Sequence, residues 1–169
     1  GTSRENVSAH VEKILSDLKP IETVLDTGNE AIDIILGEKL DVCQRADIPC
    51  MVMVDGHALS FIHQLDLVTI LGNAMDNAIE ANRNLKREDR FIRLRSAHPP
   101  GFVVLHMENS CDPSLTLTGA LPRTTKKDRQ NHGYGLQNLK EVTQKYDGEV
   151  HIEAKNGLFS LTLLWKAQG

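Results

Sequence analysis

The sequence has few of the features that mark membrane proteins or secreted, disulfide-rich proteins. Only 4% of its 169 residues are aromatic, and no apolar run approaches the ~18 residues that a membrane span needs. No basic segment followed by an apolar one opens the chain, as a signal peptide would. We therefore expect any membrane attachment of the intact protein to lie outside this chain.

Cysteines and basic charge are also scarce. Cys43, Cys50 and Cys111 are an odd number with no zinc-ligand spacing, so neither a disulfide framework nor a zinc site is encoded, and a reducing compartment fits best. The net charge of −4 argues against nucleic acid as a partner, because phosphate binding needs a basic surface. Basic residues do cluster within 83–95 and 123–129. An anionic ligand could use either cluster, although a solvated face is the simpler interpretation.

The apolar pattern predicts an N-terminal helical segment followed by an α/β domain. A heptad runs from Val7 to Leu25 with Pro20 inside it, which predicts a helix that packs on its own domain, dimerises or binds a partner helix. A second helix is expected over 30–46. The apolar period changes from 3.6 to 2 at Cys50, so we expect two parts, residues 1–48 and 49–169.

Residues 49–169 predict a two-layer α/β sandwich with a largely antiparallel sheet and the helices on one face. Residues 109–133 show no periodicity and are expected to form a long loop. The expected strands are 50–54, 91–97, 102–107, 149–154 and 158–165, and the expected helices are 64–85 and 134–146.

Three polar features of this domain are candidate site elements. Asn73, Asn77 and Glu80 share one face of helix 64–85, where a carboxamide oxygen could ligate Mg²⁺ or simply bond a neighbouring loop. His132-Gly133-Tyr134-Gly135-Leu136 opens a helix after the loop, as a phosphate cradle does, although such turns also use glycine for conformation alone. Asn109, at the expected end of strand 102–107, could contact a purine base edge or merely form a turn.

Taken together and in this order, the motifs resemble the GHKL-type ATP-binding domain of sensor histidine kinases, especially the Agr-type quorum-sensing kinases. Residues 66–81 (DLVTILGNAMDNAIEA) resemble the N box, and residues 132–140 (HGYGLQNLK) resemble the second glycine box. Residues 107–110 (MENS) stand in the place of the first glycine box, and residues 26–39 resemble the segment that joins a dimerisation helix to the ATPase domain. The resemblance implies the Bergerat, or GHKL ATPase, fold.

The resemblance also implies an ATP site. Asn77 would ligate the Mg²⁺ that bridges the ATP phosphates, with Asn73 as a second ligand or phosphate contact, and Asn109 would accept a hydrogen bond from the adenine amino group. Residues 111–132 would form the ATP lid, on which Lys126, Lys127 or Arg129 could neutralise phosphate charge. The implied nucleotide-binding residues are Asn73, Asn77, Asn109, Lys127, His132, Gly133, Tyr134, Gly135 and Leu136.

The sequence departs from the family pattern at three positions. No glycine follows Asn109, which is itself a neutral residue where the family has Asp, so nucleotide affinity is expected to be modest. Glu80 stands where many related kinases have Lys. Asn73 stands where hydrolysing relatives have a general-base Glu, which favours phosphoryl transfer over ATP hydrolysis, because a carboxamide cannot take a proton from water.

The implied function is that of a catalytic region that phosphorylates a histidine on a dimerisation helix outside this chain, since His10 lacks the phosphoacceptor motif. The expected partners are ATP, the kinase's own dimerisation helix in a homodimer and a response regulator, with no nucleic acid and no membrane contact by this fragment. The expected location is the cytoplasmic portion of a membrane-anchored bacterial sensor. Alternatives are an anti-sigma-type serine kinase or partner-binding regulatory module, and a scaffold that binds no nucleotide.

Overall fold

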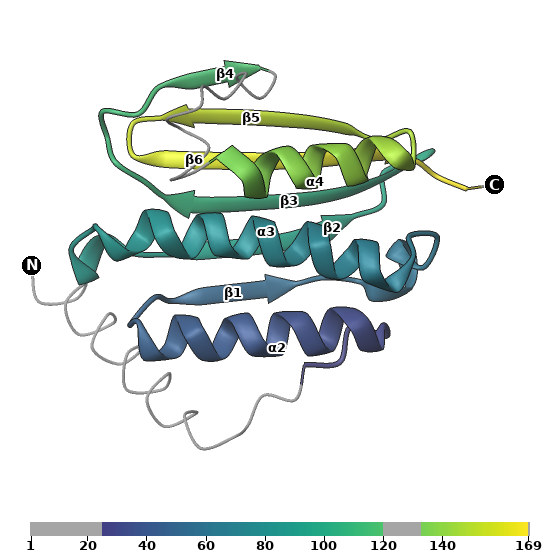
Figure 1. The fold of residues 1–169 in the computed structure, drawn as a ribbon, viewed down its shortest axis with the longest axis horizontal. Coiled ribbons are helices and arrows are strands. Elements are labelled where there is room, and N and C mark those ends of the chain that lie inside the picture. Colours follow the sequence, from purple (N-terminus) through teal and green to yellow (C-terminus); the bar gives the residue numbers. More distant parts are fainter. Residues whose placement is uncertain (1–24, 120–132, 169) are drawn as a thin grey trace, which may run out of the picture.

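A mixed six-stranded sheet forms one layer of the molecule, and helices form the other (Figure 1). The computed structural model describes residues 25–119 and 133–168. The helix predicted from Val7 lies outside these residues, and so does the heptad apart from Leu25. The described helices are α2 (Glu30–Arg45), α3 (Gln64–Arg83) and α4 (Gly133–Lys145), with short 3₁₀ turns at Gly56–Leu59 and Arg87–Asp89.

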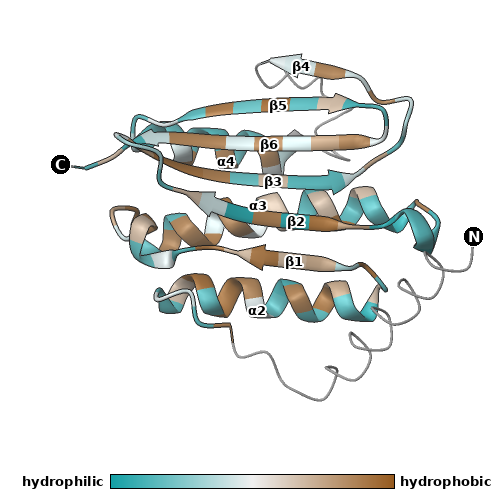
Figure 2. Cartoon of the chain, turned by 180° about the vertical axis from the view of Figure 1, so that it is seen from behind, coloured by the Kyte–Doolittle hydropathy of each residue, from teal (hydrophilic) through white to brown (hydrophobic). Residues whose placement is uncertain are grey.

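The strands follow the spatial order β1-β2-β3-β6-β5-β4. Strand β1 pairs with β2 in parallel, and the other pairs are antiparallel, so the prediction of a largely antiparallel sheet is confirmed. Seen from behind, the second face of the sheet is not covered by any of the described helices (Figure 2). The strands are β1 (Cys50–Met53), β2 (Ile92–Ala97), β3 (Phe102–Ser110), β4 (Leu117–Gly119), β5 (Glu149–Lys155) and β6 (Leu158–Lys166).

Two predictions about the middle of the chain are wrong. The strand expected to end at Met107 continues to Ser110, because Asn109 and Ser110 pair with Phe159 and Leu158 of β6. The segment expected to be a structureless loop from residue 109 contains β4, which pairs with β5. Residues 115–118 do alternate apolar and polar side chains, but only over four positions. Both segments become strands by pairing with β5 and β6, which come later in the chain.

Helix α3 lies between α2 and α4 and carries most of the helical contribution to the core (Figure 1). Its apolar side chains meet the inner face of the sheet, where Trp165 of β6 is only 1% exposed. Each large apolar side chain buried here contributes about 1.5–3 kcal/mol to folding. The fully buried α3 residues include Leu67, Ile70, Leu71, Met75 and Ala78.

Helix α2 packs against the same core. Its first turn is capped by Asn29, whose side-chain oxygen accepts the Ile32 N–H at 3.2 Å. Ile35 lies over Gly72 of α3, and one turn further along Lys39 pairs with Asp76 at 2.8 Å. Helix α2 is thus bound to α3 by apolar and ionic contacts, while the predicted domain boundary at residue 49 stays a prediction. Within the described residues, no helix has the length and apolarity needed to cross a membrane.

Candidate functional site

The helix that carries the N-box residues turns Asn73 and Asn77 away from the core. Asn73 and Asn77 lie one turn apart on α3 and are half-buried, whereas their neighbours Ala74 and Ala78 are buried against the sheet. Glu80 is exposed on the turn after Asn77. The predicted placement of Asn73 and Asn77 on one face of a helix is therefore confirmed, and neither residue is fully buried.

The first turn of α4 lies directly against this face of α3. Gly135 is so close to Asn73 that a Cβ atom built at residue 135 would lie 3.4 Å from the Asn73 Oδ1 atom and 3.7 Å from its Cβ atom. Gly135 therefore packs closely against the Asn73 side chain, and a larger residue at position 135 would press on the Asn73 carboxamide. Two motifs that are far apart in the sequence, the helix asparagines and the glycine turn, thus meet at one place.

The residues of the glycine turn differ in how exposed their side chains are. Helix α4 begins at Gly133, as the sequence predicts to within one residue, so the first N–H groups of this helix lie at the turn. Tyr134 is 61% exposed, and Leu136 is half-buried against the core. His132 and the basic residues Lys126, Lys127 and Arg129 lie outside the described residues.

Asn109 lies inside β3 and not in a loop at its end. Its side chain is fully buried and lies on the sheet face that α3 covers, because Met107, two positions earlier, also faces inward. The Asn109 Nδ2 group donates to the Ser110 carbonyl at 2.9 Å. Its Oδ1 atom, however, has no hydrogen-bond partner in the described part of the chain, and neither has the Ser110 hydroxyl.

An unpaired buried acceptor costs about 1–3 kcal/mol, so the Asn109 Oδ1 atom calls for a donor that is not part of the described chain. The residues that follow Asn109 do not form a glycine turn: Cys111 is buried, and its N–H donates to the Gly157 carbonyl at 2.9 Å. Burial, and next the charge of Asp112, raise the pKa of the Cys111 thiol, which therefore stays protonated.

Metal binding at this site would depend on carboxamide oxygens. Across residues 25–119 and 133–168, no three His, Cys, Asp or Glu side chains gather as metal ligands. Asn77 and Asn73 offer neutral oxygens of the type that Mg²⁺ accepts when phosphate oxygens and water complete its coordination.

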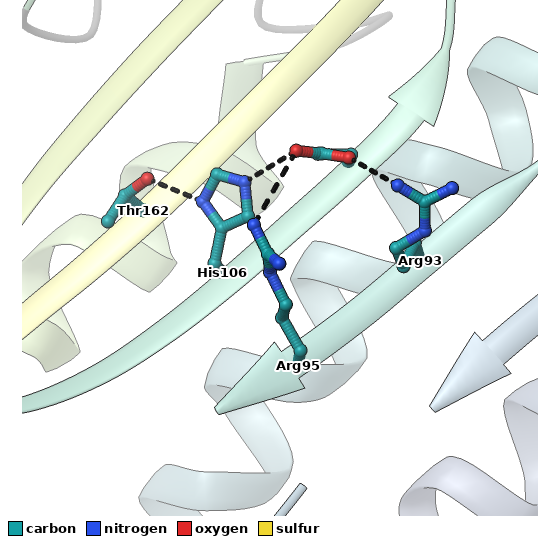
Figure 3. A network of polar contacts seen from close by, with 5 residues as sticks. Arg93, Arg95, His106 and Thr162 are labelled. Atoms are coloured by element: carbon teal, nitrogen blue, oxygen red, sulfur yellow. Dashed lines mark hydrogen bonds and ion pairs between the residues drawn. The ribbon is translucent and has the colours of Figure 1, made fainter. Parts of the chain in front are cut away.

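A separate polar network lies on the opposite, open face of the sheet (Figure 3). Glu108 accepts from Arg93 at 3.0 Å and from His106 at 3.0 Å, and the other His106 nitrogen contacts the Thr162 hydroxyl at 2.8 Å. The hydrogen bond from His106, helped by Arg93 and Arg95, holds the pKa of Glu108 below its usual range. Arg93 and Arg95 of the first basic cluster are thus engaged on the face away from α3.

Sequence reasoning missed the contacts of Asp66, the first residue of the N-box motif. Its carboxylate accepts from the Tyr146 hydroxyl and from Lys145 Nζ at 2.8 Å, which joins the start of α3 to the end of α4. Asp66 and Tyr146 are 80 positions apart in the sequence. No spacing rule within one segment could therefore indicate this contact.

Comparison with known proteins agrees with this geometry. The sequence matches the GHKL domain family over residues 62–166, whereas no curated protein matches it. The catalytic domain of histidine kinase ThkA has a TM-score of 0.63 at 19% identity, over 82% of this chain and 92% of that chain. The mycobacterial sensor histidine kinase MprB has a TM-score of 0.56 at 17% identity, over 82% and 95%.

A third structure, the Acinetobacter baumannii histidine kinase AdeS, has a TM-score of 0.56 at 12% identity over 82% of this chain and 64% of that chain. At such identities these similarities establish the shared fold. The family match covers more than half of the chain, and its range includes the N-box helix, Asn109 and the glycine turn. The chain therefore belongs to the GHKL domain family.

Proposed function

We propose that this chain is the ATP-binding catalytic region of a two-component sensor histidine kinase. It would transfer the γ-phosphate of ATP to a histidine on a dimerisation helix that lies outside the chain. The observation that carries the proposal is the contact of Gly135 with Asn73, because it brings the asparagine face of one helix next to the first amides of another.

The described residues fit a nucleotide at two points. The unpaired, buried Oδ1 atom of Asn109 suits the adenine amino group, which would supply the missing donor. The first N–H groups of α4 suit phosphate oxygens, because the positive end of a helix attracts anions. Tyr134 and Leu136 contribute their main-chain N–H groups to this cradle, together with Gly133 and Gly135.

Mg²⁺ would be held by Asn77, with Asn73 as a second ligand or phosphate contact, and when bound it would offset the phosphate charge. The chain's own residues supply orientation: Asn109 holds the base, and the helix amides hold the phosphates. Asn73 cannot act as a general base, so the site favours transfer to a positioned acceptor over attack by water. Lys127 and His132, on the proposed ATP lid, would add phosphate contacts.

The wider setting is part of the same proposal. Residues 1–48 would comprise the second dimerisation helix and the connecting helix, and 49–169 the catalytic domain. The kinase would work as a homodimer, pass its phosphate to a response regulator and form the cytoplasmic portion of a membrane-anchored bacterial sensor. The motifs quoted above favour an Agr-type quorum-sensing kinase.

The first experiment is a calorimetric titration of ATP into the protein with and without Mg²⁺, beside the variant Asn77→Ala. We expect binding that needs Mg²⁺ and is weakened about tenfold or more in the variant, equivalent to about 1.4 kcal/mol. The exposed Asn84, at the end of α3 and outside every site motif, provides the matched control, and Asn84→Ala should bind as the wild type does. Binding that is equally tight in Asn77→Ala would contradict the assigned metal ligand.

A second experiment separates the kinase classes. The protein is mixed with its missing dimerisation helix and labelled ATP, and the product is tested for stability in acid. Phosphohistidine is lost in acid, whereas the phosphoserine expected of an anti-sigma-type kinase survives it. Bound ATP without any phosphohistidine would count against the proposal, and no ATP binding at millimolar concentration would favour the scaffold.

A further inference from the structure

The ends of α3 and α4 that lie away from the glycine turn are joined by a polar cluster. We name His63, Asp66 and Tyr146 the α3–α4 latch. His63 caps α3, Asp66 lies in its first turn, and Tyr146 follows the last residue of α4. None of these residues has a place in the proposed nucleotide site.

The Tyr146 hydroxyl is the centre of the latch. It donates a hydrogen bond to Asp66 Oδ2 and accepts one from the His63 main-chain N–H at 3.0 Å. The Asp66 side chain is only 17% exposed, and its second partner, Lys145, is 64% exposed. The hydrogen bond from Lys145, followed by that from Tyr146, holds the pKa of Asp66 below its usual range, so the carboxylate is charged at neutral pH.

The latch is anchored to the sheet through aromatic rings. The Tyr146 ring meets Phe61 edge-on, with centroids 6.3 Å apart, and Phe61 meets the buried Trp165 edge-on at 5.8 Å. Such pairs have preferred geometries and resist displacement. The hydroxyl of Tyr146 therefore stands at a defined position relative to β6, and it holds the start of α3 there.

Two contacts define how the antiparallel helices lie. Gly135 meets Asn73 at one place, and Tyr146 meets Asp66 at the other. Seven residues of helix separate Asp66 from Asn73, a rigid distance of about 10 Å at ~1.5 Å per residue. A slide or rotation of α4 along α3 would break the latch, and it would also change the space between Asn73 and the glycine turn.

We propose that the α3–α4 latch sets the register of α4 on α3 and thereby the width of the nucleotide cradle. Asp66 and Tyr146 are then positioning residues for ATP, which they do not touch. This inference rests on the proposed function. It adds that residues that do not contact ATP control the affinity of the protein for ATP.

The test uses Tyr146→Phe, which removes only the hydroxyl and keeps the ring on Phe61. Calorimetry with the non-hydrolysable analogue AMP-PNP and Mg²⁺ should show a dissociation constant about fivefold higher or more, within the range by which residues away from a ligand modulate binding. Asp66→Ala should have the same effect. Measurements are made well below the melting temperature of each variant, so that every sample is folded.

The control is a variant that destabilises the fold elsewhere. Arg90→Ala removes contacts at the far end of α3, and its dissociation constant should differ from that of the wild type by less than about twofold. If Tyr146→Phe lowers the melting temperature as Arg90→Ala does but binds AMP-PNP like the wild type, the latch is merely structural and the inference is overturned.

Failure of the proposed function gives a different result, because the wild type itself would then not bind AMP-PNP. In that case the role of the latch in helix register is tested without nucleotide, from the NMR signals of the Gly135 amide and the Asn73 side-chain amide. Displaced signals in Tyr146→Phe, but not in Arg90→Ala, would support the role of the latch in helix register. Unmoved signals would overturn it.

Discussion

Asn82 and Asn109 have the same carboxamide and are both fully buried, yet they differ in what surrounds them. The Asn82 Nδ2 group donates to the Ala78 carbonyl at 2.9 Å and to the Phe91 carbonyl at 3.2 Å, and its Oδ1 atom accepts the Phe91 N–H at 3.0 Å. Asn82 is therefore satisfied within the protein and ties α3 to the start of β2. The Oδ1 atom of Asn109 has no such partner in the described part of the chain. We therefore assign a ligand to Asn109 and not to Asn82.

Arg90 is the residue for which we expect a large effect on stability. Its guanidinium donates to the carbonyls of Ala46 at 2.7 Å, Leu85 at 3.0 Å and Arg83 at 3.1 Å, which end α2 and α3. Arg90→Ala should lower the free energy of unfolding by about 2 kcal/mol, because three charged hydrogen bonds to the carbonyls that end two helices are lost.

Urea denaturation measures this loss, and Arg87→Ala is its control. Arg87 forms an ion pair with Asp47 at 3.2 Å, but the two side chains are 77% and 55% exposed. Such a pair is worth less than ~1 kcal/mol. If the two substitutions lower the free energy of unfolding equally, the hydrogen bonds from Arg90 to the carbonyls do not stabilise the fold more than an exposed ion pair does.

Among the secondary-structure elements, α3 and α4 form the proposed nucleotide cradle, where Gly135 lies against Asn73. Gly135→Val would place a branched side chain against the Asn73 carboxamide, and we expect ATP affinity to fall about tenfold, a loss of ~1.4 kcal/mol. The contact with Asn73 also costs stability, but helix propensity favours Val over Gly and offsets part of this cost, so the free energy of unfolding should fall by about 1 kcal/mol or less.

Titration calorimetry beside urea denaturation separates these two effects. Gly37→Val is the matched control, because a Cβ atom at residue 37 of α2 would meet nothing within 4 Å. That variant should bind ATP normally. If Gly135→Val also binds ATP normally, the contact between Gly135 and Asn73 is not part of the nucleotide site.

The sequence predicts the elements whose pattern is local. Helices α2 and α3 follow from apolar residues at helical spacing with a cap or a break at each end, and the β5–β6 hairpin follows from Asn156-Gly157, where Asn156 adopts φ 54° and Gly157 φ 79°. Strand β4 and the end of β3 escape prediction because their stability comes from pairing with β5 and β6.

The same distinction applies to the candidate site. Asn73 and Asn77 can be placed on one helix face from their spacing, and Gly133–Leu136 at a helix start from the preceding polar run. Their meeting across α3 and α4 depends on tertiary packing, as do the burial of Asn109 and the contact between Asp66 and Tyr146. No spacing rule within one segment reports such contacts.

Over the whole molecule, the two faces of the sheet differ, since helices cover one face and a charged network lies on the other (Figures 2 and 3). We expect this network to affect stability mainly through Glu108. Its pKa in the folded protein lies below the ordinary value of ~4.3, so its contribution is present at neutral pH and is lost as the pH falls through the folded-state pKa.

Glu108→Gln should therefore be less stable than the wild type at pH 7, by about 1 kcal/mol or less. The difference should shrink as the pH falls below about 4. Thermal denaturation from pH 7 to pH 3 measures it. Glu153→Gln, on an exposed residue of β5 with no ion-pair partner in the described part of the chain, should show no such trend. A difference that grows in acid would contradict this assignment.

The strand order also has a consequence for the route of folding. The β2–β3 and β5–β6 pairs join neighbours in sequence, whereas the central β3–β6 pair joins distant segments, such as His106 and Thr162, 56 positions apart. Closing so long a loop is slow, because its entropy must be lost before the pairing can form. The two hairpins should form early, and their joining along β3 and β6 should be the rate-limiting step that completes the sheet.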